Sequence, residues 1–71
     1  MNMNDWKEFS IMALPPRGFV LVYVEFDDPV SVPQILKAYF SHHDGYWRTQ
    51  YGRLNGKVTH WQPMPLPPKA T

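Results

Sequence analysis

The sequence predicts a mainly β fold: a small antiparallel meander of three to four strands with an aromatic core, an N-terminal arm and a C-terminal polyproline strap. Aromatic residues make up 15% of the chain, and a β-branched and aromatic run covers residues 19–26. Prolines follow Trp61 too densely for a helix or central strand to continue. Because 71 residues form one domain at most, we expect an arm over 1–17, a meander over 18–62 and a Pro-rich tail over 63–71.

A core this small rarely supplies more than about 3–5 kcal/mol, so such chains need an additional stabiliser. There is no cysteine, which excludes disulfides and thiolate zinc sites and fits a cytosolic setting. The first residues show no signal-peptide pattern, and the longest apolar run, Phe19 to Val24, is too short to span a bilayer. Large aromatic side chains and self-association remain as stabilisers, and we expect no membrane association.

Trp6 and Phe9 stand at helical spacing, but the stretch from Asp5 to Ser10 is too short for an independent helix. We therefore interpret it as an N-terminal arm anchored by Trp6. The residues from Leu14 to Gly18 have turn chemistry, which ends the arm and starts the first strand.

Residues 19–26 are the clearest strand. Both of its alternating faces are apolar, which indicates that both faces are covered. One face would pack against the rest of the sheet's core, and the N-terminal arm, the proline tail or another subunit could cover the other face.

Residues 31–41 fit two patterns. Ser31 followed by Gln34 resembles a helical capping box, so a short helix within 32–41 is one interpretation. Leu36 and Phe40 also follow the alternation of a strand. We favour the strand.

The residues His42 to Gly45 predict a tight turn, with Gly45 at positive φ, and Tyr46 to Tyr51 predict the next strand. Asn55-Gly56 is a strong hairpin signal, and we expect it to pair the strand before it with the strand that contains Trp61. That register places Trp47 and Trp61 on one face only if Gly52 forms a bulge, which we favour.

The tail is interpreted as a polyproline II segment that lies across the protein's own aromatic side chains, in preference to a ligand for an external module. Four residues are assigned structural roles, three as aromatic anchors and one as a strand histidine beside a tryptophan. They are Trp6, Trp47, Trp61 and His60.

We expect no enzymatic activity. Ser41 and His42 are adjacent, so their side chains point apart and form no nucleophile–base pair. The neighbouring carboxylates Glu25, Asp27 and Asp28 lie at a strand end beside proline. No set of residues meets the geometric requirements of a catalytic site.

We also expect no metal or other cofactor. The segment from His42 to Asp44 offers imidazole and carboxylate groups, and His60 is the third histidine. A zinc site needs three or four ligands that converge in a tetrahedron, and neighbouring histidines seldom both point inward.

The candidate binding site is a basic hairpin in which aromatic and cationic residues alternate, together with the turn before it. Its residues are Tyr46, Arg48, Tyr51, Arg53, Lys57, His42 and His43. Single-strand nucleic-acid binders use such platforms, but three cations and a net charge of +1 predict only weak binding. Nucleic-acid binding is therefore a secondary alternative.

Several motifs spread along the chain resemble a family of small phage and prophage proteins, the family called domain of unknown function 551. They are Leu14-Pro15, Gly18, Val20-Leu21-Val22-Tyr23, Asp44-Gly45-Tyr46-Trp47, Val58-Thr59-His60-Trp61 and Met64-Pro65-Leu66-Pro67-Pro68. One departure is Gln62-Pro63, which separates Trp61 from Met64. The resemblance implies a phage or mobile-element origin and the cytoplasm of a bacterial host, and it implies no catalytic residues.

Small accessory phage proteins often bind and block host machinery. We therefore expect a non-enzymatic binding protein that inhibits or modulates a host protein complex, such as an anti-phage immunity system of the CRISPR kind. An alternative is an oligomeric sponge, in which two or more copies bury a nucleotide-like signalling molecule between aromatic and arginine side chains.

Overall fold

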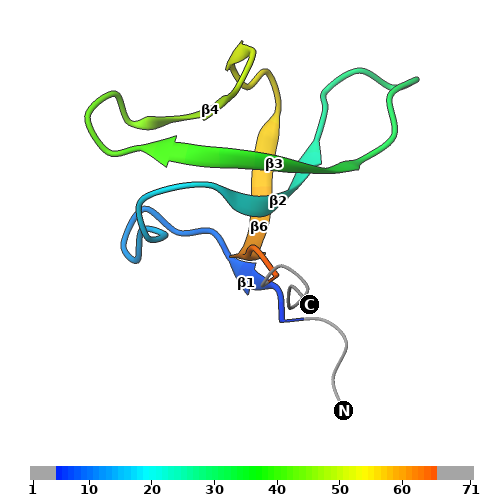
Figure 1. Cartoon of the computed structure of the whole chain (residues 1–71). Coiled ribbons are helices and arrows are strands. Elements are labelled where there is room, and N and C mark those ends of the chain that lie inside the picture. Colours follow the sequence, from blue (N-terminus) through cyan, green and yellow to red (C-terminus); the bar gives the residue numbers. More distant parts are fainter. Residues whose placement is uncertain (1–4, 66–71) are drawn as a thin grey trace, which may run out of the picture.

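A computed structural model describes residues 5–65 and shows one antiparallel sheet (Figure 1). Its strands are β1 (Lys7–Glu8), β2 (Val20–Glu25), β3 (Gln34–Ser41), β4 (Tyr46–Thr49), β5 (Gly52–Arg53) and β6 (Lys57–Pro63). The prediction of a mainly β fold is confirmed, with six strands where three to four were expected. No helix occurs in residues 5–65, so residues 34–41 form a strand as favoured.

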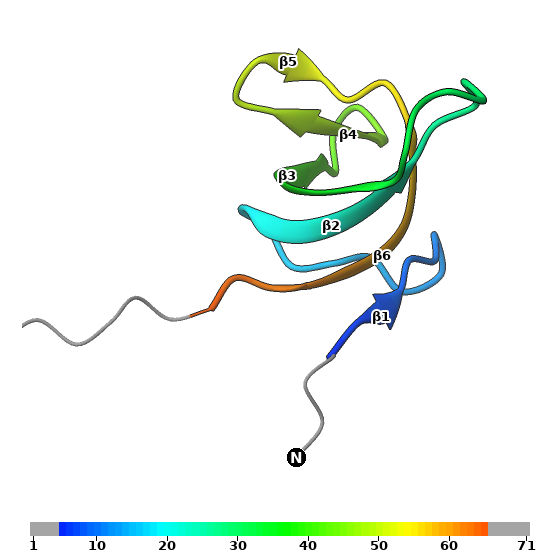
Figure 2. The ribbon, with the colours of Figure 1, turned by 90° about the vertical axis from the view of Figure 1, so that its right-hand side faces the viewer.

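The strand order β1-β6-β2-β3-β4-β5 contains the predicted meander, from β2 to β5. The last strand, β6, does not pair with β5. It returns across the molecule to lie between β1 and β2, and the sheet curls around a shared interior (Figure 2). The expected hairpin at Asn55-Gly56 is therefore wrong.

A different two-residue turn makes the hairpin in this region. Thr49 pairs with Gly52, so the turn is Gln50 and Tyr51, and Gly52 has a φ of +121°. Gly56 serves close packing instead: a Cβ atom there would lie 2.6 Å from Cγ1 of Val24. A glycine is therefore required at position 56, because the chain there packs against β2 and not because a turn needs it.

The bulge also lies elsewhere than predicted. Tyr23 is opposite His60 and Val24 is opposite Val58, so Thr59 is the extra residue, and Gly52 is not. Because one residue is added, Val58 and Trp61 both face the interior, which a regular strand does not allow for residues three apart. The bulge thus places Trp61 in the core.

The core is the concave side of the curled sheet. Its members are four valines, one alanine and three aromatic residues: Val20, Val22, Val24, Ala38, Phe40, Trp47, Val58 and Trp61. The Phe40 and Trp47 rings lie 5.5 Å apart, and Phe9 packs against both. The predicted aromatic core is confirmed.

The N-terminal arm lies along β6. Lys7 is opposite Trp61, and the amide of Phe9 donates to the carbonyl oxygen of Thr59 at 2.9 Å. Trp6 packs edge-on against Tyr23, on the outer face of β2, with ring centroids 6.3 Å apart. The arm therefore contributes one ring to each face of the sheet.

The described part of the tail is exposed. Pro63 ends β6 opposite Val20, and residues 63–65 all lie at the surface. The remainder of the predicted strap, 66–71, lies outside the described residues. In the part of the chain that the structure covers, no helix is long and apolar enough to cross a membrane.

Candidate functional site

The outer face of the β4–β5 hairpin carries three of the predicted binding residues. Strand alternation places Trp47 in the core and turns Tyr46 and Arg48 to the outside. The turn at residues 50 and 51 then sets Arg53 opposite Arg48. The pairing of β4 with β5 thus brings the guanidinium groups of Arg48 and Arg53 to Tyr46.

These three residues contact one another and form what we call the Tyr46–arginine cluster: Tyr46, Arg48 and Arg53. The guanidinium carbon of Arg53 lies 4.3 Å from the centroid of the Tyr46 ring, and that of Arg48 lies 5.7 Å away. Nη1 of Arg48 also donates to the Tyr46 hydroxyl oxygen at 3.2 Å. The ring holds both cations in place through cation–π attraction.

One carboxylate accompanies the two cations. Asp44 accepts a hydrogen bond from Arg48 at 3.2 Å and another from the Ser41 hydroxyl at 3.0 Å. The pKa of Arg48 is raised above its ordinary value, chiefly by Tyr46 and next by Tyr39, so this side chain stays charged. Within residues 5–65, no carboxylate pairs with Arg53.

The cluster is suited to binding an anion. A guanidinium that stacks on a ring through its face keeps the N–H groups of its edge available, and these match a carboxylate or a phosphate in a two-bond geometry. Arg53 is exposed and lies closest to the ring, so its edge is the most available donor.

Tyr51 lies at the tip of the same hairpin and is 90% exposed. Its backbone amide donates to Oγ1 of Thr49 at 3.0 Å, which fixes the turn. A large exposed ring beside a basic cluster is typical of residues that dominate protein interfaces.

Lys57 does not join the cluster. In the register of β2 and β6 it lies opposite Glu25, and both residues line a surface hollow of about 460 Å³ that Asp27 also borders. The sequence placed Lys57 with the arginines because it placed a hairpin at Asn55-Gly56. With that hairpin absent, Lys57 lies among acidic residues instead.

The two histidines of the β3–β4 turn have different surroundings. Nε2 of His42 donates to the carbonyl oxygen of Pro15 at 3.2 Å, and its ring lies 5.5 Å from Phe40. His42 therefore ties the turn to the arm and is only partly exposed, whereas His43 is exposed. The turn itself is as expected, with Gly45 at a φ of +81°.

The residues assigned structural roles lie on both faces of the sheet. Trp47 and Trp61 are buried, 7% and 8% exposed. His60 and Trp6 flank Tyr23 on the outer face, where the three side chains line a hollow of about 210 Å³. Among residues 5–65, no three His, Cys, Asp or Glu side chains lie close enough to hold a metal ion.

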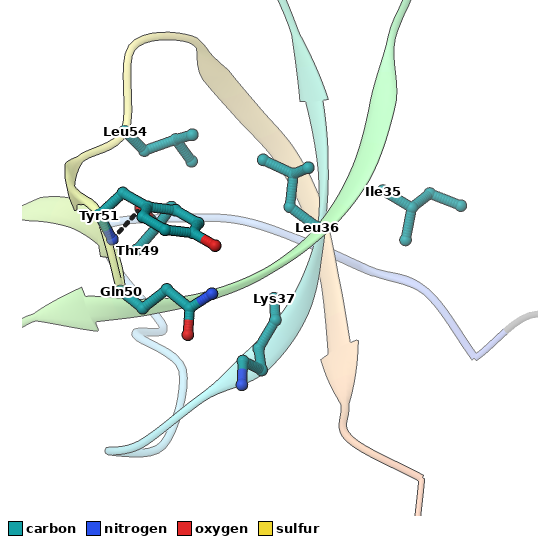
Figure 3. Close-up of a pocket in the computed structure, with 7 residues that line it drawn as sticks. All are labelled: Ile35, Leu36, Lys37, Thr49, Gln50, Tyr51 and Leu54. Atoms are coloured by element: carbon teal, nitrogen blue, oxygen red, sulfur yellow. Dashed lines mark hydrogen bonds between the residues drawn. The ribbon is translucent and has the colours of Figure 1, made fainter.

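A groove that the sequence did not predict lies beside the hairpin, and we call it the β3 groove (Figure 3). It measures about 490 Å³ and is lined by Ile35, Leu36, Lys37, Thr49, Gln50, Tyr51 and Leu54. Residue alternation predicted that 34–41 form a strand, but it carries no information on how much of that strand is paired.

Comparison with known proteins gives one match. The family model described as "Protein of unknown function (DUF551)" matches residues 13–69. No curated protein and no solved structure matches the chain. The matched segment contains the motifs from Leu14-Pro15 to the proline tail on which the family resemblance was based, whereas Trp6, from which the resemblance was taken to run, lies before it.

Proposed function

We propose that this chain, which belongs to the DUF551 family of proteins of unknown function, is a phage- or prophage-encoded binding protein without enzymatic activity. It acts in the cytoplasm of a bacterial host, where it inhibits or modulates a host protein complex, such as an anti-phage immunity system. Its partner presents an acidic surface to the Tyr46–arginine cluster.

The observation that carries this proposal is the Arg53 guanidinium. It is exposed, stacked 4.3 Å from the Tyr46 ring, and unpaired with any carboxylate in residues 5–65. Because stacking restricts the side chain in advance, less conformational entropy is lost when a partner carboxylate binds its edge.

The surroundings of the cluster support a protein partner. Arginine and tyrosine are the residue types most enriched among those that dominate protein interfaces, and Arg48, Arg53, Tyr46 and Tyr51 share one hairpin. Charged residues at such a surface chiefly raise the association rate and select against partners of the same charge.

The test is a pull-down from a bacterial host lysate with wild-type protein, Arg53→Glu and Lys57→Glu. Both variants change the charge by the same amount at exposed positions, but only Arg53 belongs to the cluster. We expect Arg53→Glu to reduce partner recovery roughly tenfold or more, because like charges then face each other. Lys57→Glu should retain the partner.

Equal recovery by wild type and Arg53→Glu would contradict the proposal. Mass spectrometry of the denatured protein and light scattering on a sizing column provide a second reading. A nucleotide that copurifies with a tight oligomer would replace the proposal with the sponge alternative.

A further inference from the structure

The first five of the eight residues of β3 have a strand on one side only. Residues 34–38 pair with β2, but β4 pairs only with 39–41. In an antiparallel ladder, alternate residues direct their N–H and C=O groups to opposite sides. Some of these groups in 34–38 therefore point away from β2, where the described residues provide no backbone partner.

This unpaired edge borders the β3 groove. In Figure 3, Leu36 from β3 and Leu54 and Tyr51 from the hairpin side face the same space. Ile35 and Tyr51 are 58% and 90% exposed. A row of unpaired backbone groups next to an apolar groove is the combination that accepts an added strand.

The charge of the groove favours an acidic occupant. None of its lining residues is acidic, and Lys37 is the cation among them. The Lys37 ammonium lies 4.9 Å from the ring of Phe19, the residue before β2, and the Lys37 side chain also lines the groove. The groove also continues into the hairpin that carries the Tyr46–arginine cluster, since Thr49, Gln50 and Tyr51 belong to both.

Other occupants fit less well. The chain's own tail is rich in proline, which lacks the N–H group that pairing needs, and its charged residue is Lys69. A second copy paired through the same edge brings two Lys37 ammonium groups to it and no carboxylate from the groove.

We infer that the partner inserts an extended acidic segment into the β3 groove, where it adds a strand to residues 34–38. One apolar side chain of that segment lies between Leu36 and Leu54, and an acidic side chain faces Lys37. This inference rests on the proposed function and specifies the conformation and charge of the partner segment that binds.

The test uses nuclear magnetic resonance on the labelled full chain with a blocked heptapeptide of alternating glutamate and valine. We expect saturable shifts in the amides of 34–38 and 49–54. A peptide with proline in place of the central valine should bind roughly tenfold more weakly, because it cannot complete the ladder. Lys37→Glu should transfer the preference to a peptide in which lysine replaces glutamate.

Tyr51→Ala should weaken peptide binding at least about threefold, since it removes an exposed ring from the groove. Val30→Ala is the matched control, because Val30 is 85% exposed and does not line the groove. Shifts at 34–38 that depend on protein concentration alone would identify a second copy as the occupant and overturn the inference.

Absence of shifts at 34–38 with the acidic peptide would also overturn it. The two proposals fail separately. Loss of the partner with Arg53→Glu, together with unchanged amide exchange at 34–38 in the complex, would leave the proposed function standing without the added strand.

Discussion

Replacing Trp61 with alanine should lower the free energy of unfolding by about 3–5 kcal/mol, the usual cost of removing a buried tryptophan. The Trp61 side chain is 8% exposed and lies between Val22 of β2 and Lys7 of β1. It therefore joins the strand that closes the sheet to both neighbours. A chain of this size has about 3–5 kcal/mol of stability to lose, so the variant should be largely unfolded at 25 °C.

Urea unfolding followed by far-ultraviolet circular dichroism measures this effect without depending on tryptophan fluorescence. Trp61→Phe provides an intermediate variant that keeps a ring in the core. Tyr51→Ala is the control, since an exposed ring at a turn should change stability by less than about 0.5 kcal/mol. A Trp61→Ala variant as stable as the wild type would exclude Trp61 from the core.

Adding a single methyl group at Gly56 should also destabilise the protein, by about 1–3 kcal/mol. The new Cβ atom would lie 2.6 Å from Cγ1 of Val24 and 2.9 Å from Cε1 of Phe26. Val24 is fully buried in β2, so it has little room to move away. Asn55→Ala is the neighbouring control, because Asn55 is exposed.

The double variant Val24→Ala/Gly56→Ala tests the stated cause. Removing the Val24 methyl groups should relieve the closest contact of the new Cβ and leave the one with Phe26, so the loss of stability should be smaller than the sum of the two single losses. Additive losses would show that Gly56→Ala acts through something other than contact with Val24. They would favour the contact with Phe26 as the cause.

Local patterns in the sequence predicted most of the elements correctly. Strand β2 follows from its run of β-branched and aromatic residues, strand β3 from residue alternation, and the turn at Gly45 from the conformational freedom of glycine. These signals act over a few residues. The strands that pair with β6 could not be predicted from the sequence, since pairing between distant segments depends on how the whole sheet curls. The bulge at Thr59 has the same origin: it adjusts β6 to β2, a strand more than thirty residues earlier.

The same distinction applies to the site. Tyr46 and Arg48 share a face because they alternate with Trp47, which the sequence made predictable. Arg53 meets them only through the turn at residues 50 and 51, which was not predicted because the strand was expected to continue to Tyr51. Lys57 was misplaced because its neighbour Gly56 was interpreted as a turn residue. The β3 groove was missed because it exists only where β4 is shorter than β3, which no residue pattern within either strand records.

Our central proposal is that rings inside a curled sheet support a hairpin whose outer face binds an acidic partner through Arg53. Its most direct test is the dissociation constant of the isolated partner for wild type, Arg53→Lys and Arg53→Glu. We expect Arg53→Lys, which keeps the charge but loses the planar fork, to bind about threefold to tenfold more weakly. Arg53→Glu should bind more weakly still. Three equal constants would contradict the account.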